Sequence, residues 1–469
     1  MNFEESNFSD DNELTDILSR FEKMLKNNER TYFDVMEYEE IIDYYLDIRK
    51  PDEALKAVTV AIGQHPQSSA LKLKNLQILL EKGQPIKVLK LMPEIQKTES
   101  GNCDFYLLKG NAYLQLGQIQ DAIRQYNKAI EYVYDDKDDL LYNIAIGFVQ
   151  ANQYKVAIRY LEKAFDENNE NISVIYELAY CYEKSDQYKM SIQLYKQYLD
   201  KNPFSDNVWY NLGILYNTIG KYEKAIDAYD FATAINKSYS SAYFNKANAL
   251  VNMEMYHKAI ESYMDFLEYE GDHSDAFCNI GECYEKSADY NNALIYYRKA
   301  LKIDNLNPDA WFGIGVVYYF QEEYVKSVEY IKKAIAFDDE NSEYWYLLGN
   351  VWAAIGNLKE ANKAFRYSTD IDPFDYEAWL NFAEMYYNND NLRRAINILN
   401  EAFELNSDVA LVSYRLAAYH FFNNNNTQGL KYLEKGLNID YIDHIDFIKQ
   451  YPDWQKSQRI RKLINKYKK

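Results

Sequence analysis

The stretch NVWYNLGILYNTIGKYEKAIDAY, residues 207–229, decides the fold. Apolar residues recur at helical spacing in two blocks, Trp209–Tyr216 and Tyr222–Tyr229, with Gly220 between them. This periodicity predicts two helices of about 14 residues, joined where glycine tolerates a left-handed backbone. Gly213 stands inside the first block, although a glycine there costs about 1 kcal/mol relative to alanine. We therefore expect Gly213 to lie where the second helix approaches closely.

The same pattern recurs along the chain with a period of 34 residues. Trp311, Trp345 and Trp379 are 34 residues apart, and Trp209 stands three periods earlier. One extra residue before Asp138 interrupts the period. Such a period indicates a repeat architecture, in which each unit buries its apolar face against its neighbours. The twelve copies start at Val35, Ser69, Cys103, Asp138, Ile172, Asp206, Ser240, Ser274, Pro308, Ser342, Tyr376 and Ala410.

Three columns of the repeat hold through most copies. Position 11 is usually aromatic, as in Tyr216 and Trp352, and position 20 is usually alanine, as in Ala225. Position 8 is small in ten copies: Gly110, Ala145, Ala179, Gly213, Ala247, Gly281, Gly315, Gly349, Ala383 and Ala417. These columns resemble the tetratricopeptide repeat. The resemblance implies an all-α fold, a right-handed superhelical α-solenoid of antiparallel helix pairs, with Trp209 and Tyr216 as packing residues.

The repeats are expected to form one solenoid over residues 35–443, because no linker rich in proline, glycine or serine interrupts them. The second copy is degenerate, with Pro85 and Pro93, and the last copy also departs from the pattern. Residues 1–34 are expected to form an acidic N-terminal tail, disordered over residues 1–16, and a capping helix over residues 13–26. The face of that helix is expected to carry Ile17, Leu18, Phe21 and Leu25.

Residues 444–469 are expected to form a basic C-terminal capping helix. From Trp454 to Lys469 the chain has seven lysines or arginines and no acidic residue. Ile460, Leu463, Ile464 and Tyr467 follow a helical spacing. A basic amphipathic helix can instead bind nucleic acid, anionic lipid or a partner protein, and this stays as the alternative function.

Charge and composition exclude several classes of protein. The net charge of −20 disfavours the body of the chain as a general binder of nucleic acid or anionic membranes, since both require surplus cations. The four cysteines form no Cys-x-x-Cys pair, which favours free thiols in a reducing compartment. The acidic N-terminus lacks an apolar signal region, and no apolar run is long enough to span a bilayer. We expect a cytoplasmic protein.

No catalytic chemistry is expected. Outside the repeats, 34 residues precede and 26 follow, too few for a catalytic domain. The five histidines are scattered, and the sequence has no zinc-protease motif, phosphate loop or nucleophile elbow. The sequence therefore predicts a non-enzymatic chain without cofactor, metal or small-molecule substrate.

The resemblance implies that positions 2, 5, 6, 9, 12 and 13 of each first helix line a concave groove. Asparagine offers a donor and an acceptor to the peptide units of an extended chain, and tyrosine adds contact area at little entropy cost. These residues are either a peptide groove or only generic repeat consensus. The candidate peptide-binding residues are Tyr142, Asn143, Tyr176, Tyr210, Asn211, Phe244, Asn245, Asn279, Phe312, Tyr346 and Asn381.

A carboxylate clamp, as in chaperone-binding repeats, is not expected. Positions 2 and 5 hold no lysine or arginine in any copy, and position 2 is often acidic, as in Asp309 and Glu343. A neutral or basic partner segment is favoured instead. The sequence thus predicts a scaffold or adaptor that binds extended or helical segments of partner proteins, with self-association as a further alternative.

Overall fold

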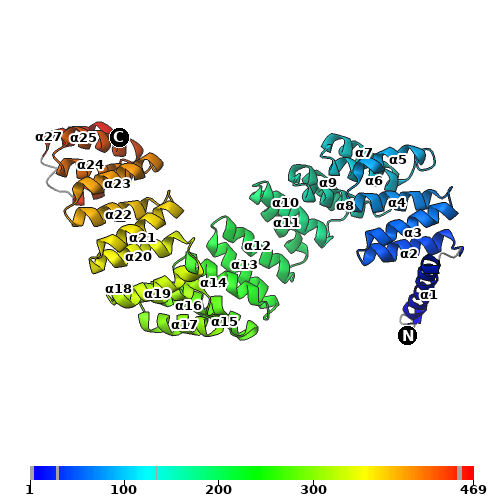
Figure 1. Ribbon diagram of the computed structural model, residues 1–469, viewed down its shortest axis with the longest axis horizontal. Coiled ribbons are helices and arrows are strands. Elements are labelled where there is room, and N and C mark those ends of the chain that lie inside the picture. The colour runs from blue at the N-terminus through cyan, green and yellow to red at the C-terminus, as the bar shows by residue number, and fades with distance from the viewer. Residues whose placement is uncertain (1–4, 28–30, 134, 451–456, 469) are drawn as a thin grey trace. The chain divides into compact units, whose positions relative to one another are not determined.

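The structure, a computed structural model, describes residues 5–27, 31–133, 135–450 and 457–468. In these residues all regular secondary structure is helical, and consecutive helices form antiparallel pairs, one pair for each repeat (Figure 1). The chain divides within helix α12 (Asp206–Thr218) into two compact units. The N-terminal unit ends at Val208, and the C-terminal unit begins at Trp209.

The first helices of the repeats begin where the 34-residue period predicts, except that α8 starts one residue early. Polar caps explain several of these starts, because the side chains of Asn307, Asn341 and Asp375 accept hydrogen bonds from backbone N–H groups of the first turn. Besides α12, these helices are α2 (Val35–Asp47), α4 (Ser69–Glu81), α6 (Cys103–Gln115), α8 (Lys137–Gln150), α10 (Ile172–Lys184), α14 (Ser240–Asn252), α16 (Ser274–Lys286), α18 (Pro308–Phe320), α20 (Ser342–Ile355), α22 (Tyr376–Asn388) and α24 (Ala410–Phe422).

The second helices all begin at position 17 of the repeat. In the degenerate second repeat the helix stops at Leu91 and a short 3-10 turn, Met92–Glu94, follows, since Pro93 has no N–H to continue the α-helix. The second helices are α3 (Pro51–Gln64), α5 (Pro85–Leu91), α7 (Ile119–Tyr132), α9 (Tyr154–Glu167), α11 (Tyr188–Lys201), α13 (Tyr222–Ile235), α15 (Tyr256–Glu270), α17 (Tyr290–Ile303), α19 (Tyr324–Phe337), α21 (Leu358–Ile371), α23 (Leu392–Leu405) and α25 (Asn426–Ile439).

The turn inside each repeat has a left-handed residue at position 15. Gly220 has φ 70°, as expected, but Glu254, Ala288 and Glu322 adopt the same conformation with φ 59°. A side chain in this region costs roughly 1–2 kcal/mol. The packing of the two helices therefore imposes the turn even where the sequence supplies no glycine.

In four repeats the glycine at position 8 leaves room for an aromatic ring from position 24 of the repeat, which lies in the second helix. A Cβ atom on Gly213 would lie 2.5 Å from Cε1 of Tyr229, whose ring is 1% exposed. Gly110 stands in the same relation to Tyr126. The propensity cost of Gly213 is thus offset by burial of a tyrosine, which confirms the expected close approach.

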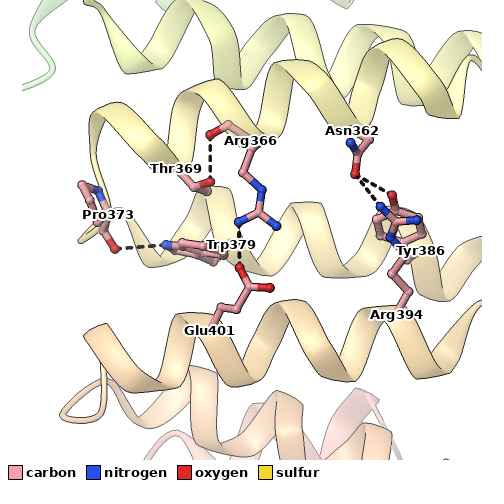
Figure 2. A network of polar contacts seen from close by, with 8 residues as sticks. All are labelled: Asn362, Arg366, Thr369, Pro373, Trp379, Tyr386, Arg394 and Glu401. Carbon is pink, nitrogen blue, oxygen red and sulfur yellow. Dashed lines mark hydrogen bonds and ion pairs between the residues drawn. The ribbon is translucent and has the colours of Figure 1, made fainter.

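The tryptophan column ties each repeat to the loop before it. Nε1 of Trp311 and Nε1 of Trp345 each donate to a backbone oxygen of the preceding loop, at 2.9 Å in both cases. Trp379 donates likewise to the oxygen of Pro373 at 3.0 Å (Figure 2). Trp209 stacks on Phe231 with ring centroids 4.4 Å apart. These rings hold the repeats together, as packing residues do.

Polar side chains join successive second helices across the intervening first helix. Arg366 of α21 pairs with Glu401 of α23 at 2.7 Å, and its guanidinium lies over the ring of Trp379 (Figure 2). Tyr386 donates to Asn362 at 2.6 Å beside the guanidinium of Arg394. Tyr386 at position 11 therefore has a structural role as well.

Helix α1 (Glu5–Asn27) begins eight residues before the predicted range, so the expectation of disorder over residues 1–16 was wrong from Glu5 on. Its buried face consists of Ile17, Phe21 and Met24. Leu25, which was predicted for that face, is 44% exposed, because Met24 and not Leu25 faces the core of the first repeat.

The C-terminal segment contains α26 (His444–Gln450) and α27 (Gln458–Tyr467). Ile460 and Ile464 are buried against the last repeats, and Lys466 pairs with Glu434 of α25 at 2.8 Å. Trp454, counted in the predicted basic segment, lies outside the described residues.

Candidate functional site

The C-terminal unit contains a hollow formed by the first helices of four consecutive repeats, α16, α18, α20 and α22. Its volume is about 880 Å³. Four of the predicted site residues line it: Asn279, Phe312, Tyr346 and Asn381. Many other lining residues come from positions 2, 9, 12 and 13, and some, such as Tyr290, Tyr297 and Phe365, come from second helices. We call this space the C-terminal hollow.

Tyrosine and asparagine at positions 5 and 6 bind each other across successive repeats. Nδ2 of Asn245 donates to the hydroxyl of Tyr210 at 2.9 Å, and Asn381 donates in the same way to Tyr346. Each asparagine was expected to offer a bound peptide a hydrogen-bond donor and an acceptor. In these pairs the donor, the amide Nδ2, is already hydrogen-bonded within the protein. The column therefore also has a structural role.

Asparagines at position 9 have a similar structural function. The buried ring of Tyr126 donates its hydroxyl to Oδ1 of Asn111 at 2.7 Å, and Tyr263 donates to Asn248. Because a buried phenol needs an acceptor, these asparagines satisfy the core.

The other predicted site residues lie outside the lining of the C-terminal hollow. Tyr142, Asn143 and Tyr176 belong to the N-terminal unit, and burial raises the pKa of both tyrosines. Phe244 of the C-terminal unit packs on Tyr263 and Phe266, with centroids 5.4 and 5.1 Å away. Asn211 is half-buried.

The N-terminal unit has a hollow of its own, of about 1020 Å³, between α4, α6 and α8. Leu73, Leu107, Leu108, Leu114 and Ile146 line it, together with asparagine and glutamine side chains that include Asn143. None of these apolar residues is among the predicted site residues. The same positions in the second to fourth copies would have indicated them.

The C-terminal hollow is acidic. Glu282, Glu285, Asp309, Glu343 and Glu384 line it, together with a single ammonium group, that of Lys286. The acidic residues at position 2, Asp309 and Glu343, were evident from the sequence. The glutamates at positions 9 and 12 were missed, although they occupy groove positions and could have been found there.

Burial and neighbouring charges raise the pKa of two carboxyl groups in the hollow, those of Glu285 and Glu343. The pKa of Glu285 is raised to about 7, chiefly by burial; the hydroxyl of Tyr297 and the ammonium of Lys286 oppose this rise, and Glu282 and Glu343 add to it. Burial likewise raises the pKa of Glu343, with Lys286 opposing and Glu282, Asp309 and Asp375 adding to the shift. The hollow therefore carries negative charge at a cost.

Glu285 accepts a hydrogen bond from Tyr297, whose ring lies between Gly281 and Gly313. The hydroxyl of Tyr297 donates to Oε2 of Glu285 at 2.7 Å, and the tyrosine is 2% exposed. A Cβ atom would lie 2.8 Å from this ring on Gly281 and 2.2 Å on Gly313. Glycine at position 6, where other repeats carry asparagine, is thus required by the tyrosine ring.

Nucleophilic and metal chemistry find no support in the described part of the chain. There, no group of three His, Cys, Asp or Glu side chains could hold a metal ion. Cys278 and Cys283 are buried, and burial raises the pKa of the Cys283 thiol to about 12 and that of Cys278 further still. Thiols held protonated in this way are poor nucleophiles.

The fold and the repeat geometry define an α-solenoid of helix pairs. Sequence profiles of the tetratricopeptide repeat match residues 104–132, 148–213, 207–239, 240–273, 274–305, 308–341 and 376–409. The chain belongs to the tetratricopeptide-repeat family. This fold is typically a non-enzymatic scaffold, and no catalytic domain is identified. Among curated proteins, none matches the chain.

Solved structures of repeat proteins resemble parts of the chain. YrrB, described as a TPR protein with an unusual peptide-binding site, is 21% identical, and the match covers 39% of this chain and 95% of YrrB with a TM-score of 0.32. The Cut9–Hcn1 hetero-tetramer of APC/C is 13% identical, and the match covers 82% of this chain and 89% of the matched chain with a TM-score of 0.42. A tetratricopeptide repeat protein of Parabacteroides merdae is 16% identical, with 52% and 97% covered and a TM-score of 0.44.

No helix in the described ranges combines the length and the apolar character needed to cross a membrane.

Proposed function

We propose that this chain is a non-enzymatic scaffold whose repeats bind extended or helical segments of partner proteins. Arrays of this repeat generally mediate protein–protein interactions. The observation that carries the proposal is the C-terminal hollow, which runs over the first helices of four repeats and has the volume of a typical ligand site.

The lining of the C-terminal hollow suits a peptide. The rings of Phe312 and Tyr346 are half-buried, so a bound segment can cover their remaining surface. Asn279 and Asn350 add amide groups that can pair with a peptide backbone. Shape, apolar area and polar groups converge in one place, as recognition requires.

We place this activity in a reducing compartment such as the cytoplasm. All four cysteines are free, and three are buried. Disulfides are rare in that compartment.

The test uses the full chain and a random peptide library displayed on phage. Peptides selected on the unmodified protein are re-measured on a variant with Phe312→Ala and Tyr346→Ala. Binding should fall at least about tenfold, because truncation of central aromatic contacts costs 2 kcal/mol or more. The matched control, Phe337→Ala with Phe374→Ala, removes two rings that are 49% and 69% exposed outside the hollow. Equal loss in both variants, or in neither, would count against the groove.

A second candidate function uses the basic face of α27. Arg459, Arg461, Lys462 and Lys466 are exposed on this helix, while its apolar face packs on the last repeats. Salt-dependent binding to RNA or anionic vesicles that disappears when residues 454–469 are deleted would support this function. No binding at low salt would exclude it.

A further inference from the structure

The C-terminal hollow holds negative charge that the chain neutralises only in part, because five carboxylates line it together with the ammonium group of Lys286. In the part of the chain that the structure describes, Glu384 pairs with Arg415 at 2.8 Å. The other four carboxylates of the hollow, those of Glu282, Glu285, Asp309 and Glu343, form no ion pair there. Carboxylates that share one space are stabilised by a cation. Of these four side chains Glu285 is half-buried and the others are exposed, so a further cation can reach them.

The structure keeps this charge in fixed positions. Tyr297 holds one oxygen of Glu285, and Tyr344 donates to Oδ1 of Asp309. The ring of Tyr297 fits only because residues 281 and 313 are glycines, and each of them lies inside a helix. A mid-helix glycine costs about 1 kcal/mol relative to alanine. Tyrosine hydroxyls therefore fix the orientation of two carboxylates, although the two mid-helix glycines and the repulsion between the charges both lower the stability of the fold.

Aromatic rings stand beside these carboxylates. Tyr290, Phe312, Tyr319 and Tyr346 line the same hollow. The face of such a ring attracts a cation, with a gain of about 0.5–2 kcal/mol. A guanidinium or ammonium group therefore finds both carboxylates and aromatic faces in this space.

The N-terminal hollow also contains carboxylates, but none of the aromatic residues that the structure describes lines it. The N-terminal hollow is lined mainly by leucines and amides, together with the carboxylates of Glu39, Glu81 and Asp104. Its lysine, Lys74, pairs with Asp43 at 2.5 Å. Two grooves built from the same repeat positions thus differ in chemistry. Only the C-terminal hollow combines charge with aromatic rings.

We propose that the C-terminal hollow binds a partner segment through a positively charged side chain, arginine or lysine, seated among Glu282, Glu285 and Glu343. The proposal rests on the proposed function and names the chemistry of its partner. Charge complementarity selects the basic segment, and the aromatic rings hold the aliphatic stem and the cationic head.

The test uses full-length protein and peptides from the phage library that depend on Phe312 and Tyr346. Three proteins are compared: the unmodified chain and two triple variants. The hollow variant combines Glu282→Gln, Glu285→Gln and Glu343→Gln. The control variant combines Glu268→Gln, Glu270→Gln and Glu404→Gln. The control removes the same number of charges from exposed sites on α15 and α23. Circular dichroism checks that each variant is folded, and fluorescence anisotropy measures binding of each peptide at one salt concentration.

The selected peptides should contain arginine or lysine, and their replacement by glutamine should weaken binding at least about tenfold. The affinity of the hollow variant for these peptides should fall by a similar factor. The affinity of the control variant should fall less than about threefold, because distant surface charges act weakly through water and salt. Peptides that bind through Phe312 but contain no basic residue would overturn this inference and leave the proposed function standing. No peptide dependent on Phe312 would overturn both. Equal losses in the two triple variants would show that only overall charge matters, and would also overturn the inference.

Discussion

Replacing Glu285 with glutamine should make the protein more stable at pH 8. The folded chain raises the pKa of this carboxyl from 4.5 to about 7, chiefly by burial. The folded state therefore holds the proton more tightly than the unfolded state. Ionisation of Glu285 destabilises the fold fully above pH 7, and the penalty disappears as the pH falls toward 4.5. A shift of this size corresponds to about 3 kcal/mol, at 1.36 kcal/mol for each pKa unit.

Glutamine avoids the penalty and keeps the local contact. It carries no charge, and its oxygen can still accept the hydrogen bond from Tyr297. The gain at pH 8 should approach about 3 kcal/mol and should shrink to nearly zero at pH 4.5. Thermal unfolding followed by circular dichroism at several pH values measures the gain. Since repeat arrays can unfold in segments, hydrogen exchange of the α16 and α17 amides measures the free energy of unfolding of the repeat that contains Glu285.

The matched control is Glu384→Gln in the same hollow. Arg415 already balances this carboxylate, so its loss should leave stability at pH 8 unchanged or lower it. A Glu285→Gln variant that is less stable than the unmodified chain at pH 8 would refute the reasoning. A gain that does not change with pH would refute it as well.

Three further substitutions test the packing. Ala225→Asp should cost about 3 kcal/mol or more and lower the melting temperature, because it places an unpaired charge at a fully buried site; an unchanged melting temperature would show that the repeat register is wrong. Gly313→Ala should cost roughly 1–3 kcal/mol in denaturant unfolding, since its Cβ would meet the ring of Tyr297 at 2.2 Å, whereas Gly63→Ala, with open space around it, should cost nothing. Glu322→Gly should raise stability by up to about 1 kcal/mol, because the residue has φ 59°; a lower melting temperature would contradict that explanation.

The candidate site was predictable only in part. Four of the eleven predicted site residues, Asn279, Phe312, Tyr346 and Asn381, line one hollow. The pairing of Asn381 with Tyr346 was not predictable, because it depends on how two repeats are placed relative to each other.

The acidic character of the C-terminal hollow also required the tertiary structure. The carboxylates come from different positions of successive repeats, as with Glu285 at position 12 and Glu343 at position 2. The sequence shows each as one charge on an acidic helix. The shift in the pKa of Glu285 arises only when burial and neighbouring charges combine.

By itself, the sequence determined the fold class, the repeat and the starts of eleven of the twelve first helices, because local periodicity and the 34-residue period report which face of each helix is buried. It also determined that Gly213 allows a close approach and that the tryptophan column packs. The tertiary structure decided which polar groups are already satisfied within the protein and which carboxylates share one space. Hydrogen bonding and electrostatics depend on distances between repeats, and periodicity carries no information on those distances.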